Sequence, residues 1–177
     1  MRSKIRKHLV ATFQREFEEQ HPQFALSKLS DGATKIWEWR VSPSFHCFAV
    51  LHPFEQEDKF AIEIAWSEDG SFPWASMGDE FSPDRRCWRE RLGRLWAPHG
   101  KEPLWDAAPE VAAARQARFD VMLDGGQVSY PPPPDVDVAI PRIGPLVDDC
   151  LQKFREYRLP VFEHVAQHRG ISLSSGA

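Results

Sequence analysis

The chain has 177 residues, which fits one domain because domains usually run about 100–200 residues, and we expect residues 1–177 to share a single core. With 42% hydrophobic and 27% charged residues, that core can form without disulfides or metal. The formal net charge of −4 gives no overall positive field for nucleic acid, and no stretch approaches the roughly 18 apolar residues that a membrane span requires.

An amphipathic helix is predicted over residues 2–20. Its apolar stripe consists of four residues spaced four apart, Ile5, Leu9, Phe13 and Phe17. Such spacing places them on one side of a helix. The helix is expected to end at His21-Pro22, because proline disfavours the helical conformation in the residue before it.

Four strand-like runs follow, over residues 24–29, 34–41, 45–52 and 59–67. Turn residues separate them, which predicts antiparallel hairpins. Pairing across these turns sets Trp39 opposite Cys47, and Cys47 opposite Ile64, so large apolar side chains gather on one face. The sequence therefore predicts an α+β fold, in which a four-stranded antiparallel meander packs against the N-terminal helix and several C-terminal helices.

The second half of the chain is expected to be helical. Ser82-Pro83-Asp84 is typical of a helix start, which predicts a helix over the following arginine-rich residues to about Trp96. Three further segments are predicted to be helical, over about 109–122, from about 143 to a break at Pro160, and over 161–168. Residues 129–135 are interpreted as a proline-rich spacer inside the domain, and residues 171–177 as a frayed tail.

Several motifs follow one another in a characteristic order after the first helix. They are Trp37-Glu38-Trp39-Arg40, Phe60-Ala61-Ile62-Glu63-Ile64, Arg89-Glu90-Arg91-Leu92-Gly93-Arg94-Leu95 and Trp105, with Leu159-Pro160-Val161-Phe162-Glu163 near the end. Through this order, residues 2–105 resemble the bacterial family called domain of unknown function 4304, with a weaker match at 159–163. The resemblance implies the fold and a bacterial cytoplasmic setting, and it implies no activity.

The other face of the predicted meander carries four residues with chemical potential, Glu38, Arg40, His46 and Glu63. The two glutamates are expected on either side of Phe48. Such a set can perform the acid–base steps of a hydrolase, or it can form salt bridges on a hydrated surface. Because Ile36 and Val50 share this face with Phe48, we expect the C-terminal helices or a partner to cover part of it.

Residues 85–94 hold five arginines and one glutamate, on the predicted helix. Arg85, Arg89 and Arg91, together with Trp88, can bind phosphate or stack on a base, which makes nucleic-acid binding an alternative function. The same arginines can instead flank a buried stripe, with Arg89 paired to a carboxylate from residues 55–80.

No metal or cofactor site is predicted. His164 and His168 have a spacing that metal ligands use, but no glutamate follows the first of them. The three cysteines, Cys47, Cys87 and Cys150, are odd in number and widely spaced, which indicates reduced thiols of a cytoplasmic protein.

The favoured interpretation is a non-enzymatic cytoplasmic protein of a bacterium that binds another protein, as an immunity-like or regulatory adaptor. Tryptophan and arginine dominate the energetics of protein interfaces, so the binding surface is predicted in and around an aromatic loop that spans 66–81. The residues expected to form it are Trp66, Phe72, Trp74, Asp79, Glu80, Arg89 and Arg91. Alternatively, that loop is a lid packed by its own aromatic residues. The sequence leaves the oligomeric state open.

Overall fold

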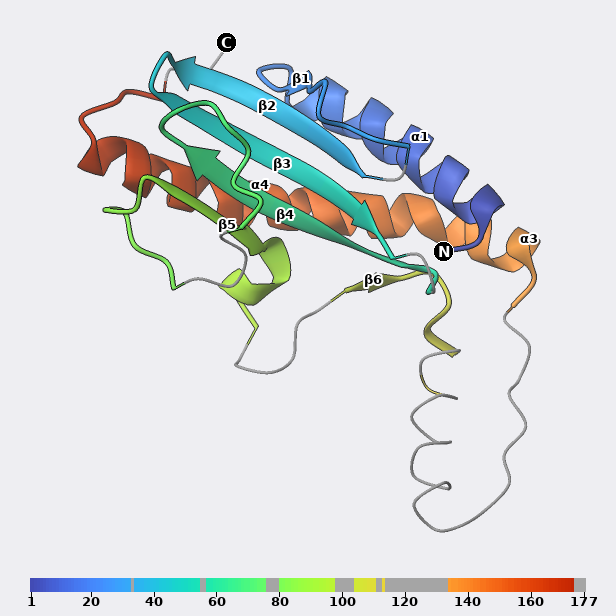
Figure 1. Cartoon of the computed structure of the whole chain (residues 1–177). Coiled ribbons are helices and arrows are strands. Elements are labelled where there is room, and N and C mark those ends of the chain that lie inside the picture. Colours follow the sequence, from blue (N-terminus) through green and yellow to red (C-terminus); the bar gives the residue numbers. More distant parts are fainter. Residues whose placement is uncertain are drawn as a thin grey trace.

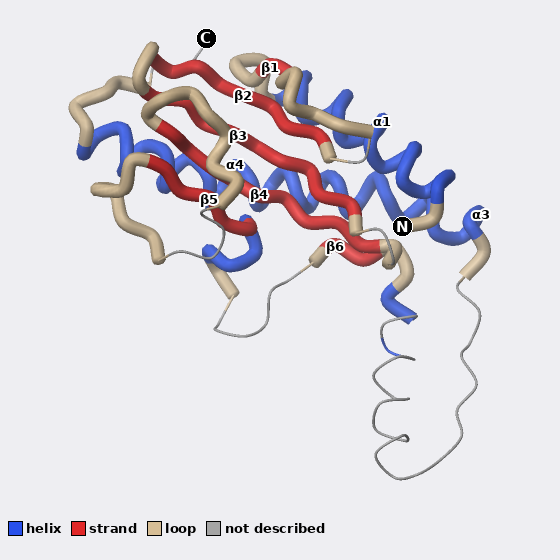
Figure 2. Tube along the Cα trace, viewed as in Figure 1, coloured by secondary structure: helices blue, strands red, loops and turns tan. Residues whose placement is uncertain are grey.

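The computed structural model describes residues 1–32, 34–54, 57–75, 80–97, 104–110, 113 and 134–173. In this part of the chain, an antiparallel sheet lies in front of two long helices (Figures 1 and 2). The strands are β1 Ala25–Leu26, β2 Lys35–Ser42, β3 Phe45–Pro53, β4 Lys59–Ser67, β5 Cys87–Arg91 and β6 Trp105–Asp106. The helices are α1 Ser3–Gln20, the short α3 Val136–Ala139, α4 Ile143–His168, and two 3-10 turns, η1 Leu92–Leu95 and η2 Ile140–Arg142.

The predicted α+β class and the N-terminal helix are confirmed, but the sheet is larger than expected. Within the described residues it has six strands in the order β1-β2-β3-β4-β5, with β6 pairing to β4. The predicted helix over the arginine-rich residues is wrong, because residues 87–91 form strand β5 along the edge of β4. Trp88 enters the core on one face of the sheet, while Arg89 points to the other face. Pairing with β4 stabilises this strand more than the local residue preferences stabilise a helix.

The hairpin between β3 and β4 is shifted by two residues from the predicted register. Cys47 lies opposite Trp66 rather than Ile64, and Glu63 lies opposite Val50, so the glutamates do not flank Phe48. The pairing extends past the predicted strand end at residue 52, because β3 continues to Pro53 and the backbone N–H of Phe54 donates to the carbonyl of Lys59. A shift of two residues leaves every side chain on its predicted face, because the side-chain period of a strand is two.

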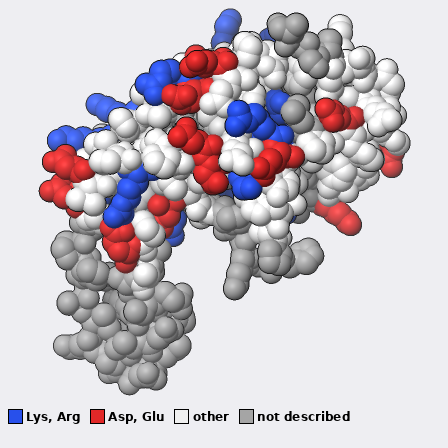
Figure 3. All heavy atoms as spheres, turned by 180° about the vertical axis from the view of Figure 1, so that it is seen from behind, with Lys and Arg blue, Asp and Glu red and all other residues white. Residues whose placement is uncertain are grey.

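The main core lies between the sheet and the two long helices. All four residues of the predicted α1 stripe are buried, and the rings of Phe13 and Phe17 lie 5.5 and 4.9 Å from that of Trp37. Helix α4 adds buried side chains that include Phe154 and Phe162. Seen from behind, the outer surface of this helical layer carries acidic and basic side chains close to one another, as expected of a solvated face (Figure 3).

Helix α4 does not break at Pro160, as the sequence predicted. It continues to His168, with the proline inside. Proline removes one helical hydrogen bond, but Phe154, Phe162 and Val165 remain buried on the same side of the helix and hold both halves in line. Most of the predicted helix over 109–122 and of the proline-rich spacer over 129–135 lies outside the described residues, as do residues 174–177 of the tail.

A buried cationic side chain links α4 to the end of α1. Arg158 is 1% exposed, and its guanidinium carbon lies 4.8 Å from the ring centre of Phe154 and 5.3 Å from that of Phe24. Burial lowers the pKa of Arg158 to about 10. Burial and the positive charges of Arg158 and Arg155 lower the pKa of His21 to about 4, so His21 is neutral in the folded protein at pH 7.

The first prediction concerns acid stability. In the unfolded chain His21 takes up a proton near pH 6.5, but in the folded chain only near pH 4, so the unfolded state binds more protons between these values. We expect the free energy of unfolding to be highest above pH 6.5 and to fall by about 2–3 kcal/mol as the pH falls toward 4, since one pKa unit is worth about 1.4 kcal/mol.

Urea unfolding across this pH range, for the native sequence and for His21→Gln, measures the effect. The variant should show the shallower dependence on pH. His8→Gln, on an exposed position of α1, serves as the matched control and should keep the native slope. Equal slopes for the native chain and His21→Gln would contradict this account.

Candidate functional site

A loop that follows β4 crosses the sheet face opposite the helices (Figure 1). We call residues 68–75 the crossing loop. Phe72 of this loop packs edge-on against Phe48 at 5.3 Å between ring centres. It completes a second, smaller apolar cluster, whose other members are Ile36, Phe48, Val50 and Ala65. The crossing loop therefore covers this face, and the expectation that the C-terminal helices do so is wrong, because α4 packs on the opposite side.

A buried ion pair anchors the far end of the crossing loop. Arg89 of β5 donates from Nε and Nη2 to Oε2 of Glu63 at 2.9 and 2.6 Å. The same guanidinium lies 5.0 Å from the ring centre of Phe72, and its Nη1 donates to the carbonyl of Trp74 at 3.4 Å. The interpretation that Arg89 pairs with a carboxylate from residues 55–80 is thus confirmed, and Glu63 is that carboxylate.

Trp74 is exposed and yet closely held. Its residue is 61% exposed, while its ring meets that of Phe72 edge-on at 4.7 Å between centres. The guanidinium of Arg89 lies 5.8 Å from the Trp74 ring centre and also holds its carbonyl. A large aromatic surface therefore faces solvent from a position fixed by two buried side chains.

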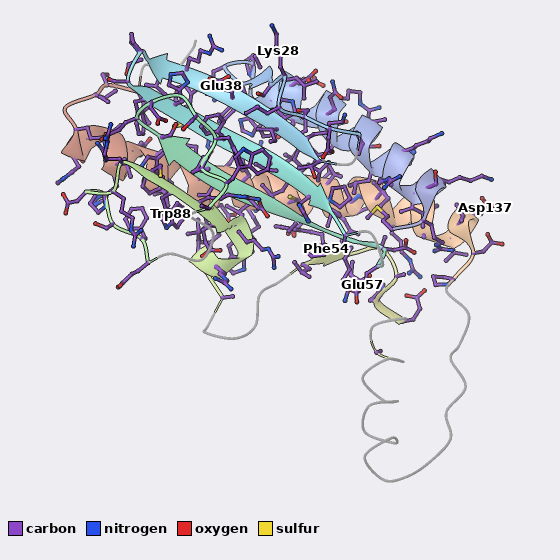
Figure 4. All side chains as sticks on the ribbon, viewed as in Figure 1. Lys28, Glu38, Phe54, Glu57, Trp88 and Asp137 are labelled. Carbon is purple, nitrogen blue, oxygen red and sulfur yellow. The ribbon has the colours of Figure 1, made fainter. Side chains whose placement is uncertain are left out.

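Three of the four predicted catalytic residues come together at the other end of the crossing loop. His46 Nδ1 lies 2.7 Å from Oε1 of Glu38, and Arg40 Nε donates to the same oxygen at 3.0 Å. They line a pocket of about 900 Å³ beside β1 and β2. In Figure 4, Glu38 lies on β2 at this place, while Lys28 projects outward from the neighbouring loop. The fourth residue, Glu63, does not line the pocket, because the register of β4 places it opposite Val50, where it pairs with Arg89.

Glu38 remains ionised in this arrangement. Burial alone would raise its pKa, but hydrogen bonds with Arg40 and His46 prevail and hold the pKa of Glu38 below its usual value. A carboxylate that engages one nitrogen of an imidazole fixes the orientation of the ring. Among the described residues, the other ring nitrogen of His46 has no hydrogen-bonding partner.

Gly70 sets the position of the His46 ring. It has a φ of 74°, a conformation that residues with a side chain rarely adopt. A Cβ atom at this position would lie 2.9 Å from Cε1 of His46, so the glycine backbone stands directly against the imidazole. No local pattern in the sequence indicates that the turn at Gly70 packs on the histidine of β3.

The predicted binding residues do not form one surface. Phe72, Trp74 and Arg89 are brought together, whereas Trp66 is buried on the opposite sheet face, stacked on Trp88 at 4.9 Å. Arg91 lies over the ring of Phe54 at 5.4 Å. Glu80 is exposed, and Asp79 lies outside the described residues. Trp66 is therefore withdrawn from the binding surface, because its side chain is buried in the main core.

The structure shows no metal centre in the part of the chain that it describes. No group of three or more potential metal ligands occurs there. His168 pairs with Asp84 at 2.7 Å, and the ring of His164 lies 6.0 Å from that of Phe81, so the two histidines have separate neighbours. Cys47 and Cys150 are buried free thiols, and burial raises the pKa of both, while Cys87 is half-buried.

In comparisons with known proteins, no protein-family model, no curated protein and no solved structure matches the chain. The resemblance of residues 2–105 to the domain of unknown function 4304 family stays a prediction. None of the described helices combines the length and the apolar character needed to cross a bilayer.

The second prediction tests the buried ion pair. Arg89→Ala leaves the Glu63 carboxylate buried without its partner, and we expect a loss of about 3–5 kcal/mol in the free energy of unfolding. Removing both charges in Glu63→Gln with Arg89→Met should recover most of that loss. Arg86→Ala is the matched control, because Arg86 pairs with Glu68 from an exposed position and such pairs are worth about 1 kcal/mol or less. Urea unfolding measures all three, and an Arg89→Ala variant as stable as Arg86→Ala would contradict the assignment.

The third prediction tests the glycine. Gly70→Ala introduces an atom against His46 at a backbone conformation that strains alanine, so we expect a loss of about 1–2 kcal/mol in the free energy of unfolding and changed NMR chemical shifts of the imidazole. Gly144→Ala is the control, since nothing lies within 4 Å of its added atom and alanine favours the helix. Unchanged imidazole chemical shifts of His46 in Gly70→Ala would show that the turn does not position the ring.

Proposed function

We propose that this protein is a binding module for another protein, without catalytic activity of its own, of the immunity-like or regulatory adaptor kind. The observation that carries the proposal is Trp74, whose large exposed surface is held in place by Phe72 and by the buried Glu63–Arg89 pair. The surface proposed to meet the partner is the crossing loop around Trp74, together with the exposed Glu80 that follows it.

The way in which Trp74 is held, and not its exposure alone, supports the proposal. Single exposed apolar residues are common on protein surfaces and need no explanation. An aromatic side chain fixed before binding loses little further freedom when a partner covers it, so more of its buried area appears as affinity. A residue that served only to close the crossing loop would not need to place its ring in water.

A bacterial cytoplasmic setting belongs to the same proposal. Its support is the resemblance described above, together with three cysteines that are free in the structure. Free thiols are usual in a reducing compartment, where disulfides are rare.

The fourth prediction tests the role of Trp74. The native chain, immobilised and exposed to lysate of its source organism, should retain one protein in stoichiometric amount, and Trp74→Ala should lose it. Val138→Ala truncates another exposed apolar side chain, on α3, and should retain the partner. Equal retention by the native chain and Trp74→Ala would refute the proposed surface, as would retention of no protein at all.

A hydrolase that uses Glu38, Arg40 and His46 is a second candidate, and one observation favours it: these residues line a common pocket, and Glu38 orients the imidazole. Turnover that disappears in His46→Gln would support this function over the first. Nucleic-acid binding loses its basis, because the arginine-rich segment is a strand and Glu63 engages Arg89 in the protein interior.

A further inference from the structure

The outer edge of β2 is paired along only part of its length. β1 ends the ladder with Ala25 opposite Glu38, and the Ser27 N–H donates to the carbonyl of Ile36 at 2.8 Å. Because backbone groups of alternate residues point to the same side of a strand, those of Arg40 point to this outer edge too. Among the described residues no further backbone hydrogen bond reaches the edge there. The end of β2 accordingly extends past β1 in Figure 1.

The pocket of about 900 Å³ adjoins this open edge, because Arg40 and Trp39 are among the residues that line it. Leu26 and Leu29 also line it and are 43% and 47% exposed, which gives the pocket an apolar rim. An unpaired strand edge beside an apolar rim is the arrangement that receives an extended segment of another chain as an added strand.

The charges of the pocket indicate the chemistry of such a segment. Glu38 is held by Arg40 and His46, and Oδ1 of Asp69 accepts from the backbone N–H and hydroxyl of Ser71, which leaves Oδ2 of Asp69 without a hydrogen-bonding partner in the described residues. The cations retain free donors. Nε and Nη2 of Arg40 donate to the carboxylate of Glu38, whereas Nη1 has no hydrogen-bonding partner in the described residues. Within the described residues, the ammonium of Lys28 meets no partner. Two cationic donor groups, on Lys28 and Arg40, therefore remain beside one carboxylate oxygen of Asp69, and the two donors suit a carboxylate of a ligand.

We propose that this pocket binds an extended acidic segment of the partner protein, which adds to β2 beside Arg40 and places a carboxylate against Lys28 and Arg40. This inference rests on the proposed function, since it names a second contact made by the same partner. A bulge between Arg40 and Ser42 limits the pairing to a few residues, so the segment alone binds weakly. Trp74, at the opposite end of the crossing loop, supplies affinity through a separate contact.

A short synthetic peptide tests the inference on the full chain. The probe is a hexapeptide of alternating valine and glutamate, blocked at both ends and titrated into 15N-labelled protein. We expect saturable shifts of the Arg40 and Ser42 amide signals at millimolar peptide. The double variant Lys28→Ala with Arg40→Ala should bind about tenfold more weakly, which corresponds to about 1.4 kcal/mol. Lys4→Ala removes an exposed lysine of α1 and should bind like the native chain.

Matched probes separate the parts of the proposal. A peptide N-methylated at alternate residues cannot form the ladder, and a valine–lysine peptide reverses the charge, so neither should bind. Equal binding of either peptide overturns the inference. Equal binding of free glutarate shows a simple anion site and also overturns it, as does the absence of any saturable shift.

Trp74→Ala should leave peptide binding unchanged, which keeps the two proposals distinguishable. If the partner is lost with Trp74→Ala but the peptide does not bind, only the added strand is refuted. If the peptide binds, but the native chain and Trp74→Ala retain the partner equally, only the aromatic surface is refuted.

Discussion

The buried pair of Glu63 and Arg89 is the interaction on which one whole side of the molecule depends. It joins β4 to β5, and through Phe72 and the carbonyl of Trp74 it ties the crossing loop to the sheet. Two charges placed in a protein interior cost several kcal/mol in lost hydration, so such a pair persists only when its geometry is close and its donors are used. Here three nitrogen atoms of the Arg89 guanidinium donate hydrogen bonds, two of them to Glu63 and one to the carbonyl of Trp74. The ion pair therefore holds the crossing loop in place on the sheet.

The two faces of the sheet are covered in different ways. Helices α1 and α4 cover one face with large aliphatic and aromatic side chains, as expected for a layered α+β domain. In the part of the chain that the structure describes, the other face carries a small apolar cluster under the crossing loop, with ionic contacts at both ends of that loop. Less apolar area is buried there, so the helical face carries most of the hydrophobic stabilisation and the loop face retains accessible polar groups.

Local patterns predicted the parts of the fold that depend on local periodicity. The stripe of α1 and the alternation of β2 and β3 identify their elements and their buried faces. Strand β5 was missed because Trp88 and Leu92 also fit a helical spacing, and only pairing with β4 decides between the two. The reach of Phe72 back to Phe48 and the contact of Gly70 with His46 depend on tertiary structure, so no local pattern could reveal them. Three of the predicted catalytic residues do meet, because strand register alone brings them together.

The unequal burial of the three thiols has a practical consequence. Cys47 and Cys150 are enclosed in the core and carry raised pKa values, so alkylating reagents meet them only when the chain unfolds. Cys87 is half-buried, on β5, two residues before Arg89. The native sequence thus contains a single partly exposed thiol, on the strand that carries Arg89, where a fluorophore can be attached without any engineered cysteine.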